Sequence, residues 1–324
     1  MLEGRGKRKG SAALPTMFRV AVVGVGHLGR HHARILSQMP GVDLVGVFDS
    51  NALRAEEVAA VTGSRVFSNV DSIAEEIDAV TVAVPTEFHA EVALPFLRAG
   101  ISVLVEKPIS KSVEEANSLI ESASFSSATL AVGHTERYNP AVEMAQQLIS
   151  EPRFIEVHRL APFTPRSTDV DVIFDLMVHD IDVLLSIVTG EPVSVEAVGI
   201  PVLTDRVDIA NVRLRFDTGC IVNLTASRIS REKVRKFRVF QSESYISVDY
   251  SAQDVEAWRV KLGRSGEPII VGGKVEVKRA EPLEKEIADF VRASKTGSRP
   301  RVDGEDGRRA LLLAEQIASA IDSP

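Results

Sequence analysis

The stretch FRVAVVGVGHLGRHHARIL, residues 18–36, decides the fold of the N-terminal half of the chain. An apolar, β-branched run stops at Gly24, Gly26 and Gly29, and a helical pattern follows. This pattern predicts a strand that turns sharply into a helix and presents backbone N–H groups to a phosphate. An acid, Asp49, stands 20 residues after Gly29 at the end of the next apolar run. Together these features predict a dinucleotide-binding turn. The cofactor-binding residues that it predicts are Gly24, Gly26, His27, Leu28, Gly29 and Asp49.

Asp49 favours NAD over NADP. A carboxylate at this position accepts hydrogen bonds from the ribose hydroxyls and repels a 2′-phosphate. Arg54 is close enough in sequence to leave NADP open.

Short apolar runs alternate with helical patterns throughout residues 17–137, which we interpret as an α/β Rossmann domain with a doubly wound parallel sheet. The predicted strands are 18–23, 43–48, 65–67, 79–84, 101–105 and 128–133. The predicted helices are 27–38, 52–61, 71–76, 87–99 and 112–122.

Residues 138–324 read differently and predict a substrate-binding and oligomerisation domain of α+β type. Several long β-rich runs follow one another closely, and DTG at 217–219 is a good hairpin turn. We therefore expect a mostly antiparallel open sheet. Other predicted elements are a strand at 153–160 and helices at 140–150, 173–188, 282–294 and 306–321, of which the last two are expected to pack back on the first domain.

Composition excludes several classes of function. Lys and Arg total 38 against 45 Asp and Glu, a net charge of −7, which argues against general affinity for nucleic acid or anionic membranes. Cys220 is the only cysteine, so an intrachain disulfide and a cysteine-rich zinc site are both excluded. No run approaches the ~18 apolar residues of a membrane span. We expect a cytoplasmic protein, with residues 1–16 as a disordered leader.

Polar residues and prolines follow the fourth and fifth predicted strands, in VAVPTEFHAE at 82–91 and VLVEKPIS at 103–110. Open parallel sheets bind ligands at this carboxyl edge. The cofactor-binding residues predicted there are Pro85, Thr86, His89, Glu106 and Lys107. For His89 the alternative is a packing or capping group.

Lys107 is the first candidate for acid/base chemistry. A partly desolvated lysine at the end of a buried strand has a lowered pKa, which suits proton transfer. The alternative is a surface lysine paired with Glu106.

The stretch FDLMVHDIDVLLSIV at 174–188 supplies the second candidate. At helical spacing Asp175, His179, Asp182 and Ser186 form a narrow polar stripe on an otherwise apolar helix. We predict that the stripe faces a polar cavity, where Asp175 orients His179 from one turn away. A structural His–Asp pair is the alternative. No third ligand of suitable spacing supports zinc, and no metal is predicted.

Two stretches at the junction of the domains, GHTERYNP at 133–140 and VHRLAPFTPR at 157–166, complete the candidates. Domain junctions commonly form clefts, and an arginine fork suits a phosphate or carboxylate. The substrate-binding residues predicted here are Arg137, Tyr138, Arg159 and Arg166.

In their order along the chain, these motifs resemble the glucose-fructose oxidoreductase/inositol dehydrogenase/MocA family. The resemblance rests on GVGHLG, Asp49, AVPTEFHAE, the EKP at 106–108, the D-x-x-x-H at 175–179 and the tail PLEKEIADFV…RPRVDGEDGRRAL. It implies NAD or NADP as cofactor and a sugar, inositol or nucleotide-sugar substrate. It also implies dimers or tetramers formed through the C-terminal sheet.

The resemblance further implies that Lys107 and His179 are the acid/base groups, that Asp175 supports them, and that Pro108 sits in a tight cis turn. GHTERYNPAV with DLMVHDIDVLL resembles members that oxidise the 3-hydroxyl of UDP-N-acetylglucosamine. The leading hypothesis is a dehydrogenase that transfers a hydride from a sugar hydroxyl to nicotinamide. The alternatives are a non-catalytic dinucleotide-binding sensor and a dehydrogenase or reductase of another small molecule, such as inositol or a biliverdin.

Overall fold

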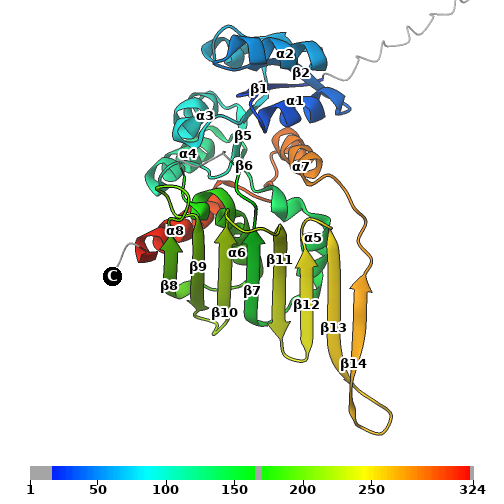
Figure 1. Ribbon diagram of the computed structural model, residues 1–324. Helices are drawn as coiled ribbons and strands as arrows, with labels where there is room; N and C mark the ends of the chain where they lie inside the picture. The colour runs from blue at the N-terminus through cyan, green and yellow to red at the C-terminus, as the bar shows by residue number, and fades with distance from the viewer. Residues whose placement is uncertain (1–16, 165–169, 322–324) are drawn as a thin grey trace, which may run out of the picture.

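The computed structural model describes residues 17–164 and 170–321, so the predicted leader and Arg166 lie outside the described residues. The chain forms two sheets, with the N-terminal sheet stacked beyond one end of a larger C-terminal sheet (Figure 1). Over the described ranges, no helix combines the length and the apolar character needed to cross a membrane.

The first sheet is parallel, with the order β3-β2-β1-β4-β5-β6. This is the strand order of a dinucleotide-binding fold, in which ligands bind where the order reverses, between β1 and β4. The predicted doubly wound sheet is therefore confirmed. Its strands are β1 (Phe18–Val23), β2 (Val42–Phe48), β3 (Arg65–Val66), β4 (Ala79–Val82), β5 (Ser102–Glu106) and β6 (Leu130–Gly133).

Helices cover both faces of this sheet because its strands are apolar on both sides. Along β1, Val20 and Val22 pack into one core and Ala21 and Val23 into the other. The helices are α1 (Gly29–Gln38), α2 (Ala52–Thr62), α3 (His89–Arg98) and α4 (Val113–Ser126). The region predicted as a helix at 71–76 is a short 3₁₀ turn, and another 3₁₀ turn, Thr86–Phe88, precedes α3.

The second sheet has eight strands in the order β14-β13-β12-β11-β7-β10-β9-β8. Within the described ranges, β7 and β10, next to the middle of the sheet, are its one parallel pair. A mostly antiparallel sheet is thus confirmed, and Gly219 turns the predicted hairpin between β9 and β10 with a positive φ of 83°. The strands are β7 (Pro152–Leu160), β8 (Pro192–Ile200), β9 (Ile209–Phe216), β10 (Ile221–Ser227), β11 (Val234–Gln241), β12 (Ser244–Asp249), β13 (Asp254–Leu262) and β14 (Pro268–Val275).

One face of the second sheet packs against helices, and the other carries exposed apolar side chains. The covering helices are α5 (Pro140–Leu148), α6 (Val178–Ile187) and α8 (Gly304–Ile321), whose apolar residues share a core with the inward side chains of the strands. Residues of the outer face include Val198, Phe240, Trp258, Val260 and Ile270, each more than a third exposed.

The C-terminal helices contact the first domain. Helix α7 (Pro282–Thr296) packs against α1 through Ile287 and Phe290, which join the core on that side of the parallel sheet. Helix α8 contacts α4 and β6, with Leu311 in the opposite core. The last part of the chain therefore closes over the domain with which the chain begins.

Candidate active site

A cleft of about 1520 Å³ lies at the carboxyl edge of the parallel sheet and reaches residues of both sheets. It is larger than the roughly 300–1,000 Å³ of a pocket for one small ligand, so two ligands can share it. The sequence-predicted residues that line it are Gly24, Gly26, His27, Leu28, Asp49, Pro85, Thr86, Glu106, Lys107, Arg159, Asp175 and His179.

The three glycines of the first turn are required for different structural reasons. Gly24 has a positive φ of 85°, and a Cβ there would lie 2.6 Å from the carbonyl oxygen of Ala83. A Cβ on Gly29 would lie 1.7 Å from the carbonyl oxygen of Gly24, so only glycine lets α1 start this close to the turn. At Gly26 the nearest atom, on Arg54, is 4.0 Å away. The missing side chain of Gly26 therefore leaves space on the cleft side, where a dinucleotide phosphate approaches the backbone closely.

Asp49 lies at the end of β2, beside this turn. Its carboxylate accepts hydrogen bonds from the backbone N–H groups of Val25 and Asn51, both at 2.9 Å. The guanidinium of Arg54 is 3.4 Å from the same carboxylate and 47% exposed at the cleft edge. Backbone donors thus hold an acid at the end of β2, the position that binds the adenosine ribose in dinucleotide-binding folds, with a cation next to it. The glycine turn and Asp49 therefore fit the NAD that this type of fold binds.

Lys107 follows β5 directly, before a cis peptide bond to Pro108 that matches the turn implied by the resemblance. Its Nζ donates a hydrogen bond of 2.8 Å to the backbone carbonyl of Asp175 and lies 3.9 Å from the carboxylate of that residue. Its side chain is only 14% exposed. Burial lowers the pKa of Lys107, while the charges of Asp175 and Glu106 oppose the shift. The lysine is therefore a desolvated cleft group rather than a surface residue.

His179 lies in the first turn of α6 and lines the cleft together with Lys107. Burial and the nearby charges of Lys107 and Arg159 hold the pKa of His179 well below its ordinary value, so the imidazole is neutral. Among the described residues, Nδ1 of His179 is buried and has no hydrogen-bond partner. A neutral imidazole has one ring nitrogen without a proton, which is able to accept one.

Asp175 does not make the predicted contact with His179. Residues Ile173–Met177 form a π-helical turn, which is wider than an α-turn and changes the phase of the side chains that follow. Asp175 consequently pairs with Lys107. The predicted polar stripe is broken as well, because Asp182 binds Arg137 and Ser186 binds Gln146 outside the cleft lining.

Arg159 lines the second-domain wall of the cleft, but its guanidinium is already paired. It binds Asp180 through Nη2 at 2.9 Å and Glu136 through Nη1 at 3.2 Å, and it lies 5.1 Å from the ring centre of Tyr250. The nearby Arg235 is 36% exposed and 4.0 Å from Glu136. Arg235 therefore has more freedom than Arg159 to meet an anionic ligand.

Three predicted contacts are corrected by their positions in the structure. Arg137 turns inward to Asp182, and Tyr138 is buried with its hydroxyl 3.0 Å from Asp289; neither lines the cleft. His89 is 1% exposed, and its two ring nitrogens lie 2.8 Å and 2.9 Å from the backbone carbonyls of Pro108 and Val84. It is thus a packing group that braces the Pro108 turn, the alternative noted above.

Several cleft residues were missed by sequence reasoning. Glu136 and Asn139 lie inside the stretch 133–140, where polar residues after a strand were the available signal. Arg235 comes from β11, and Tyr250 and Gln253 come from the turn between β12 and β13; no motif marks them.

Comparison with known proteins agrees with this geometry. The model of the GFO/IDH/MocA oxidoreductase family with an NAD-binding Rossmann fold matches residues 18–134, and that of the GFO/IDH/MocA C-terminal domain matches 142–247. UDP-N-acetylglucosamine 3-dehydrogenase of Acidithiobacillus ferrooxidans is 40% identical over 94% of this chain and 98% of its own length. A solved structure of that enzyme has a TM-score of 0.88 with the same coverage.

More distant relatives share the architecture. Inositol 2-dehydrogenase of Rhizobium meliloti is 27% identical over 94% of this chain and 96% of its own length. Levoglucosan dehydrogenase in complex with NADH has the same fold, with a TM-score of 0.83 at 20% identity over 94% of this chain and 97% of that chain. Both halves of this chain match, and a relative of 40% identity spans nearly all of it. This chain therefore belongs to the GFO/IDH/MocA family of NAD-binding oxidoreductases.

Proposed function

We propose that this protein is an NAD-dependent dehydrogenase that oxidises the 3-hydroxyl of a UDP-N-acetylhexosamine. The observation that carries the proposal is that Lys107 and His179 line one cleft with the dinucleotide turn, in a chain 40% identical to UDP-N-acetylglucosamine 3-dehydrogenase. The size of the cleft supports a bulky second ligand beside the cofactor.

The chemistry divides between the cofactor and the side chains. NAD supplies the hydride acceptor when bound. The neutral imidazole of His179 accepts the proton of the sugar hydroxyl, while the ammonium of Lys107 stabilises the developing alkoxide. Asp175 holds Lys107 through its backbone carbonyl and carboxylate. Because both groups are fixed in one buried cleft, the reacting hydroxyl is oriented before proton transfer.

The experiment that tests this function is a screen of nucleotide sugars and free polyols, followed by the absorbance of NADH. We expect turnover with UDP-N-acetylglucosamine or its epimer and little with free inositol. A sensor protein would bind NAD and show no turnover with any of them. Preferred turnover of inositol would instead contradict the nucleotide-sugar assignment while leaving the dehydrogenase class intact.

Asp49→Ala is expected to narrow or reverse a preference for NAD over NADP. The carboxylate repels a 2′-phosphate, and its removal leaves Arg54 to attract that group. The measurement is kcat/KM for each cofactor in the wild type and the variant. Asp43→Ala, at the exposed opposite end of β2, is the matched control and should leave the ratio unchanged. A wild type that prefers NADP would show that Arg54 outweighs the acid.

A homodimer or homotetramer formed through the outer face of the second sheet is also part of the proposal. Trp258, Val260 and Ile270 lie on that face, and Ile270 is 74% exposed. An extended apolar sheet face is typical of an interface between subunits.

Introducing charge on this face is therefore expected to dissociate the assembly. For the double variant Trp258→Lys and Ile270→Lys we expect a monomer in sedimentation velocity, with the far-ultraviolet circular dichroism spectrum unchanged. Phe125→Lys, at a side chain 95% exposed on α4, is the control and should keep the wild-type mass. A wild type that is already monomeric at micromolar concentration would exclude this interface.

A further inference from the structure

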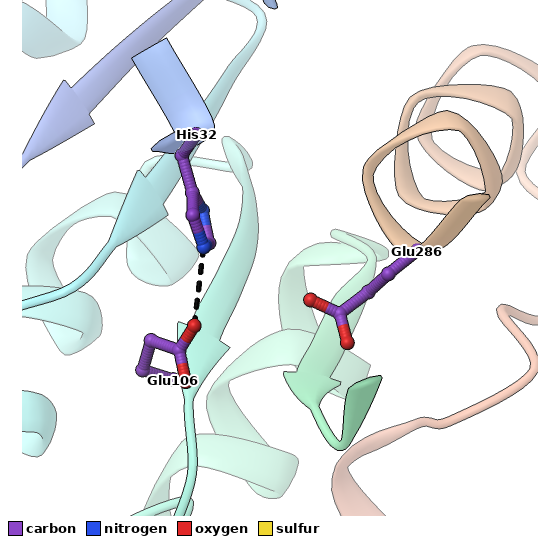
Figure 2. Close-up of side chains that lie close together, drawn as sticks. All are labelled: His32, Glu106 and Glu286. Atoms are coloured by element: carbon purple, nitrogen blue, oxygen red, sulfur yellow. Dashed lines mark hydrogen bonds and ion pairs between the residues drawn. The ribbon is translucent and has the colours of Figure 1, made fainter. Parts of the chain in front are cut away.

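Three buried ionisable side chains, one of which also lines the cleft, lie close together, each from a different helix or strand. Figure 2 shows His32 of α1, Glu106 at the end of β5 and Glu286 of α7 directed toward a common space. One ligand atom of each lies within 4.8 Å of the others, and their exposed fractions are 0%, 6% and 1%. We call these three residues the buried triad.

Two members of the triad are already hydrogen-bonded. The carboxylate of Glu106 lies 3.1 Å from Nε2 of His32 and accepts the backbone N–H of Lys107, also at 3.1 Å. Both donors favour the ionised carboxylate. The pKa of Glu106 is lowered despite its burial, through the hydrogen bond and charge of His32 and the proximity of Lys107.

Glu286 has the opposite surroundings. In residues 17–164 and 170–321, neither of its carboxyl oxygens has a hydrogen-bond partner. Burial raises the pKa of Glu286 well above its ordinary value, and the negative charges of Glu106, Asp182 and Asp289 add to this shift, while the nearby Thr135 side chain acts the other way. An ionised carboxylate that is buried without a partner is very costly, and two adjacent carboxylates rarely both ionise.

We propose that Glu286 is a positioning residue that carries a proton at neutral pH and uses it to donate a hydrogen bond within the buried triad. Glu106 then keeps the negative charge of the triad, and its carboxylate holds the backbone at Lys107. The separation of up to 4.8 Å is closed by a small rotation of the Glu286 side chain or spanned by one water. Helix α7, more than 170 residues away in the sequence, thereby fixes the end of β5, which Lys107 directly follows.

The effect on Lys107 rests on the function proposed above, whereas the protonation of Glu286 does not. A divalent cation is the competing occupant, because one imidazole and two carboxylates also suit Zn²⁺ or Mn²⁺. The hydrogen bond between His32 and Glu106 favours the proton, since it uses a nitrogen and an oxygen that a metal would need. The two occupants require opposite charge states of Glu286, so one substitution separates them.

The direct test compares Glu286→Gln with Glu284→Gln, a matched change at an exposed glutamate of the same helix. Difference infrared spectra at neutral pH should show the band of a protonated carboxyl that is lost in Glu286→Gln and kept in Glu284→Gln. No loss of such a band would overturn the proposal. This measurement requires no enzymatic activity, so it stands even if the proposed substrate is wrong.

Thermal stability gives a second readout. Between the ordinary pKa of glutamate and the raised value of Glu286, the folded protein binds more protons than the unfolded chain, so this group lowers the stability of the wild type as pH rises. Glu286→Gln removes that effect. The Tm of the variant minus that of the wild type should therefore increase with pH, whereas Glu284→Gln should give a flat difference. A Tm difference that falls with pH would indicate an ionised Glu286.

Metal analysis and kinetics complete the test. After dialysis against Zn²⁺ or Mn²⁺ and then buffer, we expect less than one equivalent of metal per chain. One equivalent in the wild type that is lost in Glu286→Gln would overturn the proposal.

Glu286→Ala should lower kcat about 10-fold with KM for NAD nearly unchanged, and Glu286→Gln should restore most of the wild-type kcat. Equal loss in the two variants, or loss in neither, would contradict the positioning role. If Glu286→Ala does not fold, the glutamine variant still decides.

Discussion

Lys107→Met is expected to lower kcat by roughly 10²- to 10⁴-fold, the usual share of a group that handles a proton or a developing charge. The variant should still bind NAD with nearly wild-type affinity, because the glycine turn and Asp49 lie elsewhere in the cleft. Methionine has an unbranched, apolar side chain similar to the stem of lysine and no ammonium group. The measurements are single-turnover hydride transfer and a binding isotherm for NAD.

The pH dependence of the same reaction tests the role of the charge. Burial lowers the pKa of Lys107 from the ordinary lysine value of 10.5, so the amine loses its proton at a lower pH than an exposed lysine does. In a plot of kcat/KM against pH, the limb that reports Lys107 should therefore have its midpoint at a pH below 10.5. This limb should disappear in Lys107→Met. Lys274→Met, at an exposed lysine of β14, should change neither rate nor profile. Unchanged turnover in Lys107→Met would remove this residue from the mechanism.

His179→Asn is expected to have the second-largest effect, about a 10²-fold loss or more in the rate of hydride transfer. Asparagine retains a polar side chain of similar reach but cannot accept a proton at neutral pH. Because Nδ1 of His179 has no hydrogen-bond partner among the described residues, the substitution breaks no bond at that atom. We therefore expect the Tm and the affinity for NAD to remain close to those of the wild type.

Thermal melting and single-turnover kinetics on this variant distinguish catalysis from packing. A structural histidine would show the reverse result, with a loss of ~1–3 kcal/mol of stability and intact activity per folded molecule. His158→Asn, on β7 and outside the cleft lining, is the matched control. A stable and fully active His179→Asn would contradict both interpretations.

The position of Asp175 shows where sequence periodicity stops being informative. Spacing predicted that Asp175 would orient His179, which assumes a regular α-helix through residues 173–188. The chain instead forms a π-turn at Ile173–Met177, and Lys107 takes the carbonyl and the carboxylate of Asp175. A helix pattern constrains which face is apolar, as Met177, Ile181 and Leu184 in the core confirm. The helix pattern does not determine the geometry of the turn at Asp175, because the carbonyl of Asp175 accepts a hydrogen bond from Lys107, 68 positions away in the sequence.

By itself the sequence determined the features that depend on neighbouring residues. The strand, glycine turn and helix at 18–36, the acid after β2 and the alternation of strands and helices follow from local sterics and from apolar runs that must be buried on both faces. For the same reason Lys107 was predictable, because a residue that directly follows a parallel strand lies at the binding edge wherever that strand is placed in the sheet.

Only the tertiary structure decided which polar groups face the cleft and which face one another. Arg137 binds Asp182 and Tyr138 binds Asp289, so neither side chain lines the cleft. Arg235 does line the cleft, although no sequence motif marks its strand. Glu286 meets Glu106 only because α7 packs against the first sheet. A buried charge is costly unless an opposite charge or a hydrogen-bond partner lies close to it in space, whatever their separation along the chain. These pairings therefore exist only after the two domains have packed together.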